Sequence, residues 1–83
     1  MTAAVRQRLL DQNEGFKVET TNKQQNFTEY RRYRITGAQL LIRVSGKTSW
    51  ADSRYAHEYA PATPEQTHRF LYEYQDSLNS DAL

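Results

Sequence analysis

The chain has 83 residues, a length that fits one small domain over residues 1–83, and its hydrophobic content of 37% predicts a thin core. Its formal net charge of +1 excludes a protein that is basic over its whole surface, but not one with a local basic surface. The absence of cysteine excludes a disulfide scaffold and thiolate chemistry.

The N-terminal segment predicts a short helix over residues 2–12. Thr2 is placed to cap it, and Val5, Leu9 and Leu10 form an apolar stripe at helical spacing. An alternative is a frayed N-terminal arm, because a helix this short needs tertiary packing to persist.

A first strand is predicted over residues 16–21. Here Phe16, Val18 and Thr20 alternate with polar side chains, as in a half-buried strand. The polar residues 22–26 follow, and their number is typical of a hairpin loop.

A central hairpin is predicted over residues 26–45. With a two-residue turn at Thr36-Gly37, Ile35 lies opposite Ala38, and opposed residues point to the same face. The residues expected on the core face are Tyr33, Ile35, Leu40, Ile42 and Val44. Those expected on the opposite face are Tyr30, Arg32, Arg34, Leu41 and Arg43. A three-residue loop with a bulge would swap the faces of one strand, so the sequence leaves the face of the arginines open.

Residues 50–60 fit two structures. Ser49 is placed to cap a helix, whereas the alternation of Tyr55, His57 and Tyr59 favours a fourth strand over residues 54–59. We favour the strand. Trp50, which follows a turn, is expected either to pack at the sheet edge or to anchor an interface.

The strongest local signal begins the C-terminal helix. Thr63 is an N-cap, Pro64 occupies the first helical position, and Gln66 completes a capping box. The apolar spacing predicts that this helix runs to about Leu78. The face expected to pack on the sheet consists of Thr67, Phe70, Leu71, Tyr74 and Leu78.

These elements predict an α+β fold: a three- or four-stranded antiparallel sheet (meander), a C-terminal helix packed on one face and a short N-terminal helix. The α-β-β-β-α order resembles that of double-stranded RNA-binding domains. Those domains begin their last helix with a lysine-rich phosphate clamp, and this chain has Thr63-Pro64-Glu65-Gln66 at that place. We therefore do not carry that function over.

No motif predicts catalysis. His57 and His68 are the two histidines, they lie on different predicted elements, and no third ligand has metal-site spacing. Gly46-Lys47-Thr48 ends like a phosphate-binding P-loop, but Leu41 stands where that motif needs its first glycine. We predict no catalytic residue, no metal and no cofactor, and hence a protein that is not an enzyme.

The charge is segregated along the chain. Between Tyr30 and Lys47 there are five basic residues and no acidic one, whereas the chain from Ala51 onward is mostly acidic. Arginine and tyrosine often anchor protein interfaces. The candidate partner-binding residues are Tyr30, Arg32, Arg34, Leu41, Arg43 and Trp50.

Two functions fit this basic-aromatic surface. The favoured one is a protein-interaction module of the inhibitor, adaptor or regulator type, such as mobile genetic elements encode, which binds a larger protein or protein complex. The alternative is a nucleic-acid-binding module that uses the same face, since guanidinium groups contact phosphates and rings stack on bases. We expect a cytoplasmic monomer or homodimer without a membrane segment, because no long apolar run is present.

Overall fold

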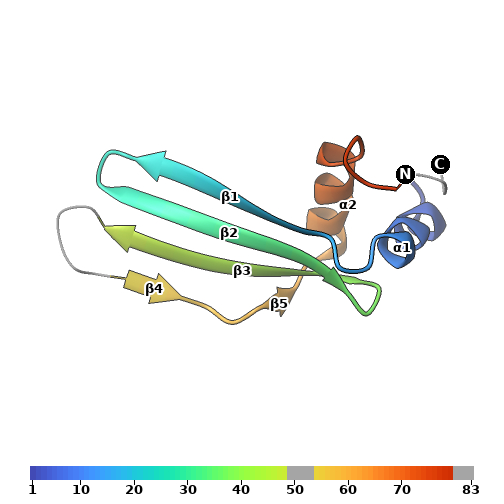
Figure 1. Ribbon diagram of the computed structural model, residues 1–83, viewed down its shortest axis with the longest axis horizontal. Coiled ribbons are helices and arrows are strands. Elements are labelled where there is room, and N and C mark those ends of the chain that lie inside the picture. The colour runs from blue at the N-terminus through green and yellow to red at the C-terminus, as the bar shows by residue number, and fades with distance from the viewer. Residues whose placement is uncertain (49–53, 80–83) are drawn as a thin grey trace.

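The computed structural model describes residues 1–48 and 54–79. Two helices flank a sheet, which Figure 1 shows as a long layer with both helices near one of its ends. In chain order the elements are α1 (Ala3–Gln12), β1 (Lys17–Gln24), β2 (Phe27–Thr36), β3 (Gln39–Thr48), β4 (Arg54–Ala56), β5 (Ala60–Pro61) and α2 (Pro64–Glu73).

The sheet is an antiparallel meander in the order β1-β2-β3-β4, and β5 also pairs with β3. The α+β architecture predicted from the sequence is confirmed. In the described part of the ambiguous segment 50–60, strand structure is present in β4 and at the start of β5, but not as one unbroken strand over residues 54–59. Pairing with β3 stops after Ala56 and resumes at Ala60. Trp50 lies outside the described residues.

The turn of the central hairpin consists of Gly37 and Ala38, not of Thr36 and Gly37 as predicted. Both turn residues have positive φ, +59° and +60°, as a type I′ turn requires. Such a turn matches the right-handed twist of the flanking strands, and it pairs Ile35 with Leu40. The predicted pairing of Ile35 with Ala38 is therefore wrong. Because the register differs by two residues, each side chain keeps its predicted face.

The first hairpin is also tighter than predicted. The loop consists of Gln25 and Asn26 alone, and Gln24 pairs with Phe27. The predicted polar loop over residues 22–26 is wrong, because residues 22–24 belong to β1. Their side chains are exposed, so no apolar alternation marked them as a strand.

Both helices begin as predicted. The backbone N–H of Val5 donates to Thr2 Oγ1 at 3.2 Å. In the capping box of α2, Gln66 N–H donates to Thr63 Oγ1 at 3.1 Å, and Thr63 N–H donates to Gln66 Oε1 at 2.9 Å. However, α2 ends at Glu73, so the prediction that it continues to about Leu78 is wrong.

A buried asparagine accompanies this early end. Asn13, just after α1, donates from Nδ2 to the carbonyl oxygens of Leu9 at 2.7 Å and Asn79 at 3.0 Å. Its Oδ1 accepts from Asn79 N–H at 2.8 Å. This clasp holds the chain after α2 against the end of α1, and it directs Leu78 into the core from outside the helix.

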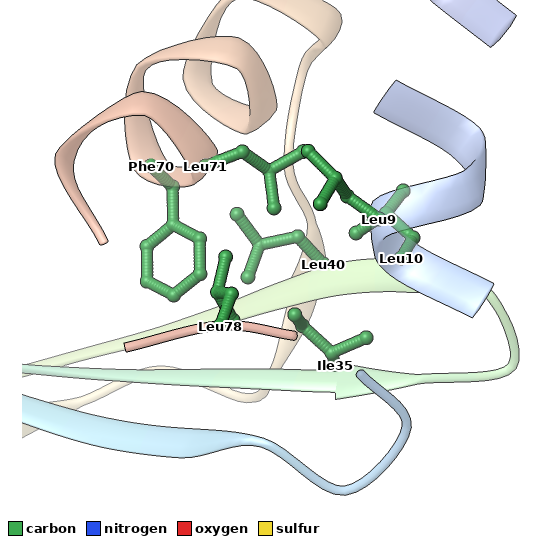
Figure 2. Packing of buried hydrophobic residues seen from close by; sticks show 7 residues of the cluster. All are labelled: Leu9, Leu10, Ile35, Leu40, Phe70, Leu71 and Leu78. Carbon is green, nitrogen blue, oxygen red and sulfur yellow. The ribbon is translucent and has the colours of Figure 1, made fainter. Parts of the chain in front are cut away.

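The core lies where both helices meet the sheet. Phe70 stacks on Tyr33 with ring centroids 4.9 Å apart, and Phe16 packs edge-on against Phe70 at 6.1 Å. Figure 2 shows the α1 and α2 residues facing the sheet residues Ile35 and Leu40. The buried cluster consists of Leu9, Leu10, Ile35, Leu40, Phe70, Leu71 and Leu78.

The sheet is longer than the helices that cover it. A ten-residue strand such as β2 spans roughly 33 Å, whereas a ten-residue helix such as α2 spans roughly 15 Å. The end of the sheet at the β1–β2 hairpin therefore extends beyond both helices in Figure 1. Residues 20–30 and 45–48 are named here the distal end. Apart from Gly46, no residue of the distal end is buried. Within the described part of the chain, no helix has the length and apolar character needed to cross a bilayer.

Candidate interaction face

The candidate site is the sheet face that points away from the helices, named here the open face. Side chains alternate along a strand, so the residues on either side of Tyr33 and Ile35 in β2 lie on the open face. Five of the six predicted partner-binding residues share this face, namely Tyr30, Arg32, Arg34, Leu41 and Arg43. Trp50, the sixth, falls among the residues that the structure does not describe.

The open face is strongly basic. Among strand residues with described side chains, the basic ones on this face are Lys17, Lys23, Arg32, Arg34, Arg43 and Lys47. Against these six stands one acidic strand residue with a described side chain, Glu19. Arg32 and Arg43 lie directly opposite each other in the ladder. Like charges in such cross-strand positions destabilise a sheet, and a neighbouring carboxylate offsets part of that cost.

Glu19 pairs with one of these arginines. Arg32 Nε donates to Glu19 Oε2 at 2.6 Å, between cross-strand neighbours on β1 and β2. The hydrogen bond that Arg32 donates to the Glu19 carboxylate raises the pKa of the Arg32 guanidinium. Both side chains are about half exposed, so the pair contributes little to stability. The contact directs the Arg32 Nε toward β1.

The other two arginines also have partners. The guanidinium carbon of Arg34 lies 5.7 Å from the ring centroid of Tyr59, a cation–π contact. Arg43 Nε donates to the backbone carbonyl of His57 at 3.0 Å. These contacts tie the segment between β4 and β5 to the arginines and place a ring beside Arg34.

These side chains surround an open trough of about 440 Å³. Lys17 and Glu19 of β1 line one part, Arg32 and Arg34 of β2 another, and Tyr59 a third. Because β5 pairs with the edge of β3 away from β2, the Tyr59 ring reaches across β3 to meet Arg34. The trough is therefore suited to an anionic group, with three cationic side chains and one carboxylate around it.

Three contributors to this site were not among the predicted residues: Lys17, Glu19 and Tyr59. The alternation in residues 16–21 placed Lys17 and Glu19 on the polar side of a strand, but their approach to Arg32 and Arg34 depends on the β1–β2 register. Tyr59 was predicted as one of the alternating residues of a fourth strand, and it is half-buried against Arg34. A two-residue loop at Gln25 and Asn26, had it been recognised in the sequence, would have predicted the register between β1 and β2.

Metal ligands do not gather in the described residues: within residues 1–48 and 54–79, no group of three or more His, Cys, Asp or Glu side chains could hold an ion. The described side chains of the open face offer ionic contact, hydrogen bonding by guanidinium groups and contact with an aromatic ring. Comparison of the chain with protein-family models, with curated proteins and with solved structures gives no match.

Proposed function

We propose that this chain is a small non-enzymatic protein-interaction module that binds an acidic surface of a larger protein through the open face. Inhibitors, adaptors and regulatory subunits act in this way. The observation that carries the proposal is the clustering of six basic side chains on a sheet face that no described helix covers. An acidic partner would relieve the repulsion between Arg32 and Arg43.

The arginines of this face are oriented before any partner arrives. The contacts of Arg32 and Arg43 use Nε, and each guanidinium has further N–H donors in a planar fork suited to carboxylates. Side chains that are already fixed lose less conformational entropy on binding. The open face thus resembles a prepared interface more than a set of freely solvated cations.

Nucleic-acid binding through the same face is the alternative function, and the density of cationic groups supports it. Base stacking has weaker support. Arg34 packs against the ring of Tyr59, which leaves Tyr30 as the other ring on the described part of the open face. The overall charge of +1 also opposes strong phosphate binding.

Affinity capture with two charge-reversed variants tests the proposal. Arg32→Glu/Arg34→Glu changes the open face, and the control Arg8→Glu/Arg69→Glu makes the same change in net charge on the helices. After nuclease treatment, we expect wild type and control to retain a protein that the open-face variant loses. That protein, purified, should bind the wild-type chain directly, and its affinity should fall at least tenfold with the open-face variant (about 1.4 kcal/mol).

Two results would overturn the proposal. One is equal binding of the purified partner by both variants. The other is recovery of nucleic acid alone, with loss after nuclease, which would select the alternative. In that case affinity should fall by about one log unit per log of salt for each phosphate contacted.

A further inference from the structure

The outer edge of the sheet at β1 is the longest unpaired strand edge in the described residues. β1 pairs with β2 on one side and with no described strand on the other. The opposite edge of the sheet, along β3, is covered by β4 and β5. β1 has eight residues and no proline, so its outer backbone groups are able to pair with another strand.

The ladder determines which backbone groups of β1 point outward. Ile35 N–H donates to the carbonyl of Phe16 at 3.0 Å, so residue 16 directs its carbonyl toward β2. In an antiparallel pair this direction alternates along the strand, and the even-numbered residues 18–24 therefore face β2. The N–H and C=O groups of Lys17, Glu19, Thr21 and Lys23 point to the free edge.

We propose that the partner contributes an extended acidic segment that adds to the edge of β1 as a further strand, a step that rests on the proposed function of the open face. Residues opposite each other in a ladder point to the same face. Side chains that lie opposite Lys17, Glu19, Thr21 and Lys23 would therefore project onto the open face, beside the trough. Strand addition and the basic face then act as one site.

Charge selects an acidic segment over a second copy of this chain. Glu19 is already engaged by Arg32, and Lys17 and Lys23 have no ion-pair partner within the described residues. These two lysines lie roughly 20 Å apart along the strand. Pairing two copies through β1 would join two basic faces edge to edge, whereas alternating carboxylates on a partner strand would meet both lysines.

Two end-blocked peptides of the length of β1 provide the probe. One alternates Glu and Thr, and the other has the same composition with all Glu in one block. We expect the alternating peptide to bind at least fivefold more tightly, because it alone places every carboxylate on one face of an extended strand. At saturation, hydrogen exchange measured by NMR should slow at the amides of residues 17, 19, 21 and 23, while the even-numbered amides, already bonded to β2, change little.

Thr21→Pro tests the backbone contact directly. The Thr21 N–H points outward, so proline removes an edge donor and no bond to β2, and Thr21→Val is the control that keeps the donor. We expect the proline variant to bind the alternating peptide about tenfold more weakly than the valine variant. The exchange experiment on the wild type remains decisive if the proline variant does not fold.

The outcomes separate the two proposals. Equal binding of both peptides, with no slowing at the odd-numbered amides, would overturn strand addition. If Arg32→Glu/Arg34→Glu nevertheless weakened the binding of the peptides, the proposed function of the open face would stand without strand addition. A dimer that forms through the same amides in the absence of peptide would also overturn the choice of an acidic segment.

Discussion

The two ends of the sheet are built differently. At the end under the helices, named here the covered end, Ile35 and Leu40 are almost fully buried. Apolar contacts from α1 and α2 add there to the hydrogen bonds between the strands. At the distal end Gly46 alone is buried and contributes no side chain, so strand pairing is what maintains the structure there. Buried apolar area is the main stabilising contribution in a small domain, so the stability of this fold is concentrated at one end.

This difference bears on the candidate site. The trough lies on the reverse side of the covered end, because Arg32 and Arg34 alternate with Tyr33 and Ile35 along β2. Each arginine is therefore attached to backbone that the core holds rigid. The outer edge of β1 reaches into the distal end, where fewer contacts resist the arrival of another strand.

The largest predicted effect tests whether the covered end carries the stability. Ile35→Ala should lower the free energy of unfolding by about 3 kcal/mol or more, because it leaves a cavity beneath both helices. Val44→Ala, at a half-buried position next to the distal end, should cost about 1 kcal/mol. Chemical denaturation measures both.

Equal losses at the two sites would contradict the comparison. If Ile35→Ala does not fold, Ile35→Val keeps the test usable, with an expected loss of about 1 kcal/mol. Its partner is then Val44→Thr, which replaces one methyl by a hydroxyl group next to the distal end and should cost less.

The sequence predicted the covered end better than the distal end for a physical reason. Burial on one face imposes alternation, which marked residues 40–44, and the capping box of Thr63, Pro64 and Gln66 marked the start of α2. In the distal end, residues 22–24 are exposed on a strand, and an exposed strand resembles a polar loop in sequence.

Long-range contacts account for the other differences. The spacing of Tyr74 and Leu78 favoured a longer α2, but the clasp from Asn13 joins residues 66 positions apart, which local spacing does not encode. The turn was misplaced for a local reason. Ala38 adopts a positive φ, and the sequence signals that predict a positive φ are glycine and asparagine, not alanine. The sequence left the face of Arg32 and Arg34 open. With the assumed two-residue turn they were expected on the face opposite the core, and they lie there, since an error of two residues leaves the faces unchanged.

The second prediction concerns the clasp that closes the covered end. Asn13→Ala removes three hydrogen bonds and leaves backbone groups of Leu9 and Asn79 without that partner, so it should cost about 2 kcal/mol. The control is Asn79→Ala, because Asn79 contributes backbone atoms to the clasp. We expect the control to change the unfolding free energy by less than about 0.5 kcal/mol. If thermal or chemical unfolding shows a similar loss of unfolding free energy in both variants, the side-chain amide of Asn13 is not what holds the two segments together.

The third prediction concerns the turn between β2 and β3. Ala38 has φ +60°, which costs an L-residue with a Cβ free energy that glycine does not lose. Ala38→Gly should therefore raise the unfolding free energy by about 0.5 kcal/mol, after the added flexibility of the unfolded chain is subtracted. Gly37→Ala, at φ +59°, should lower it by about 1 kcal/mol. Changes of the same sign in the two variants would argue against a type I′ turn at Gly37 and Ala38.

The smallest predicted effect is an alkaline pH dependence at the covered end. Burial raises the pKa of Tyr74 above its ordinary value of 10.0, and the nearby Glu73 and Tyr33 act in the same direction. Above about pH 10 the unfolded chain therefore loses this proton before the folded protein does, and the free energy of unfolding falls as pH rises. The contribution is complete below the unfolded pKa and is lost as pH passes the folded one. Tyr74→Phe should reduce the decline between about pH 9 and pH 11, whereas Tyr72→Phe, at a ring 65% exposed, is the control. Urea titrations at several pH values measure the free energy of unfolding. If it falls with pH in both variants as it does in the wild type, the alkaline loss arises outside the Phe16–Phe70–Tyr74 contact. The covered end is then less protected from water than its packing indicates.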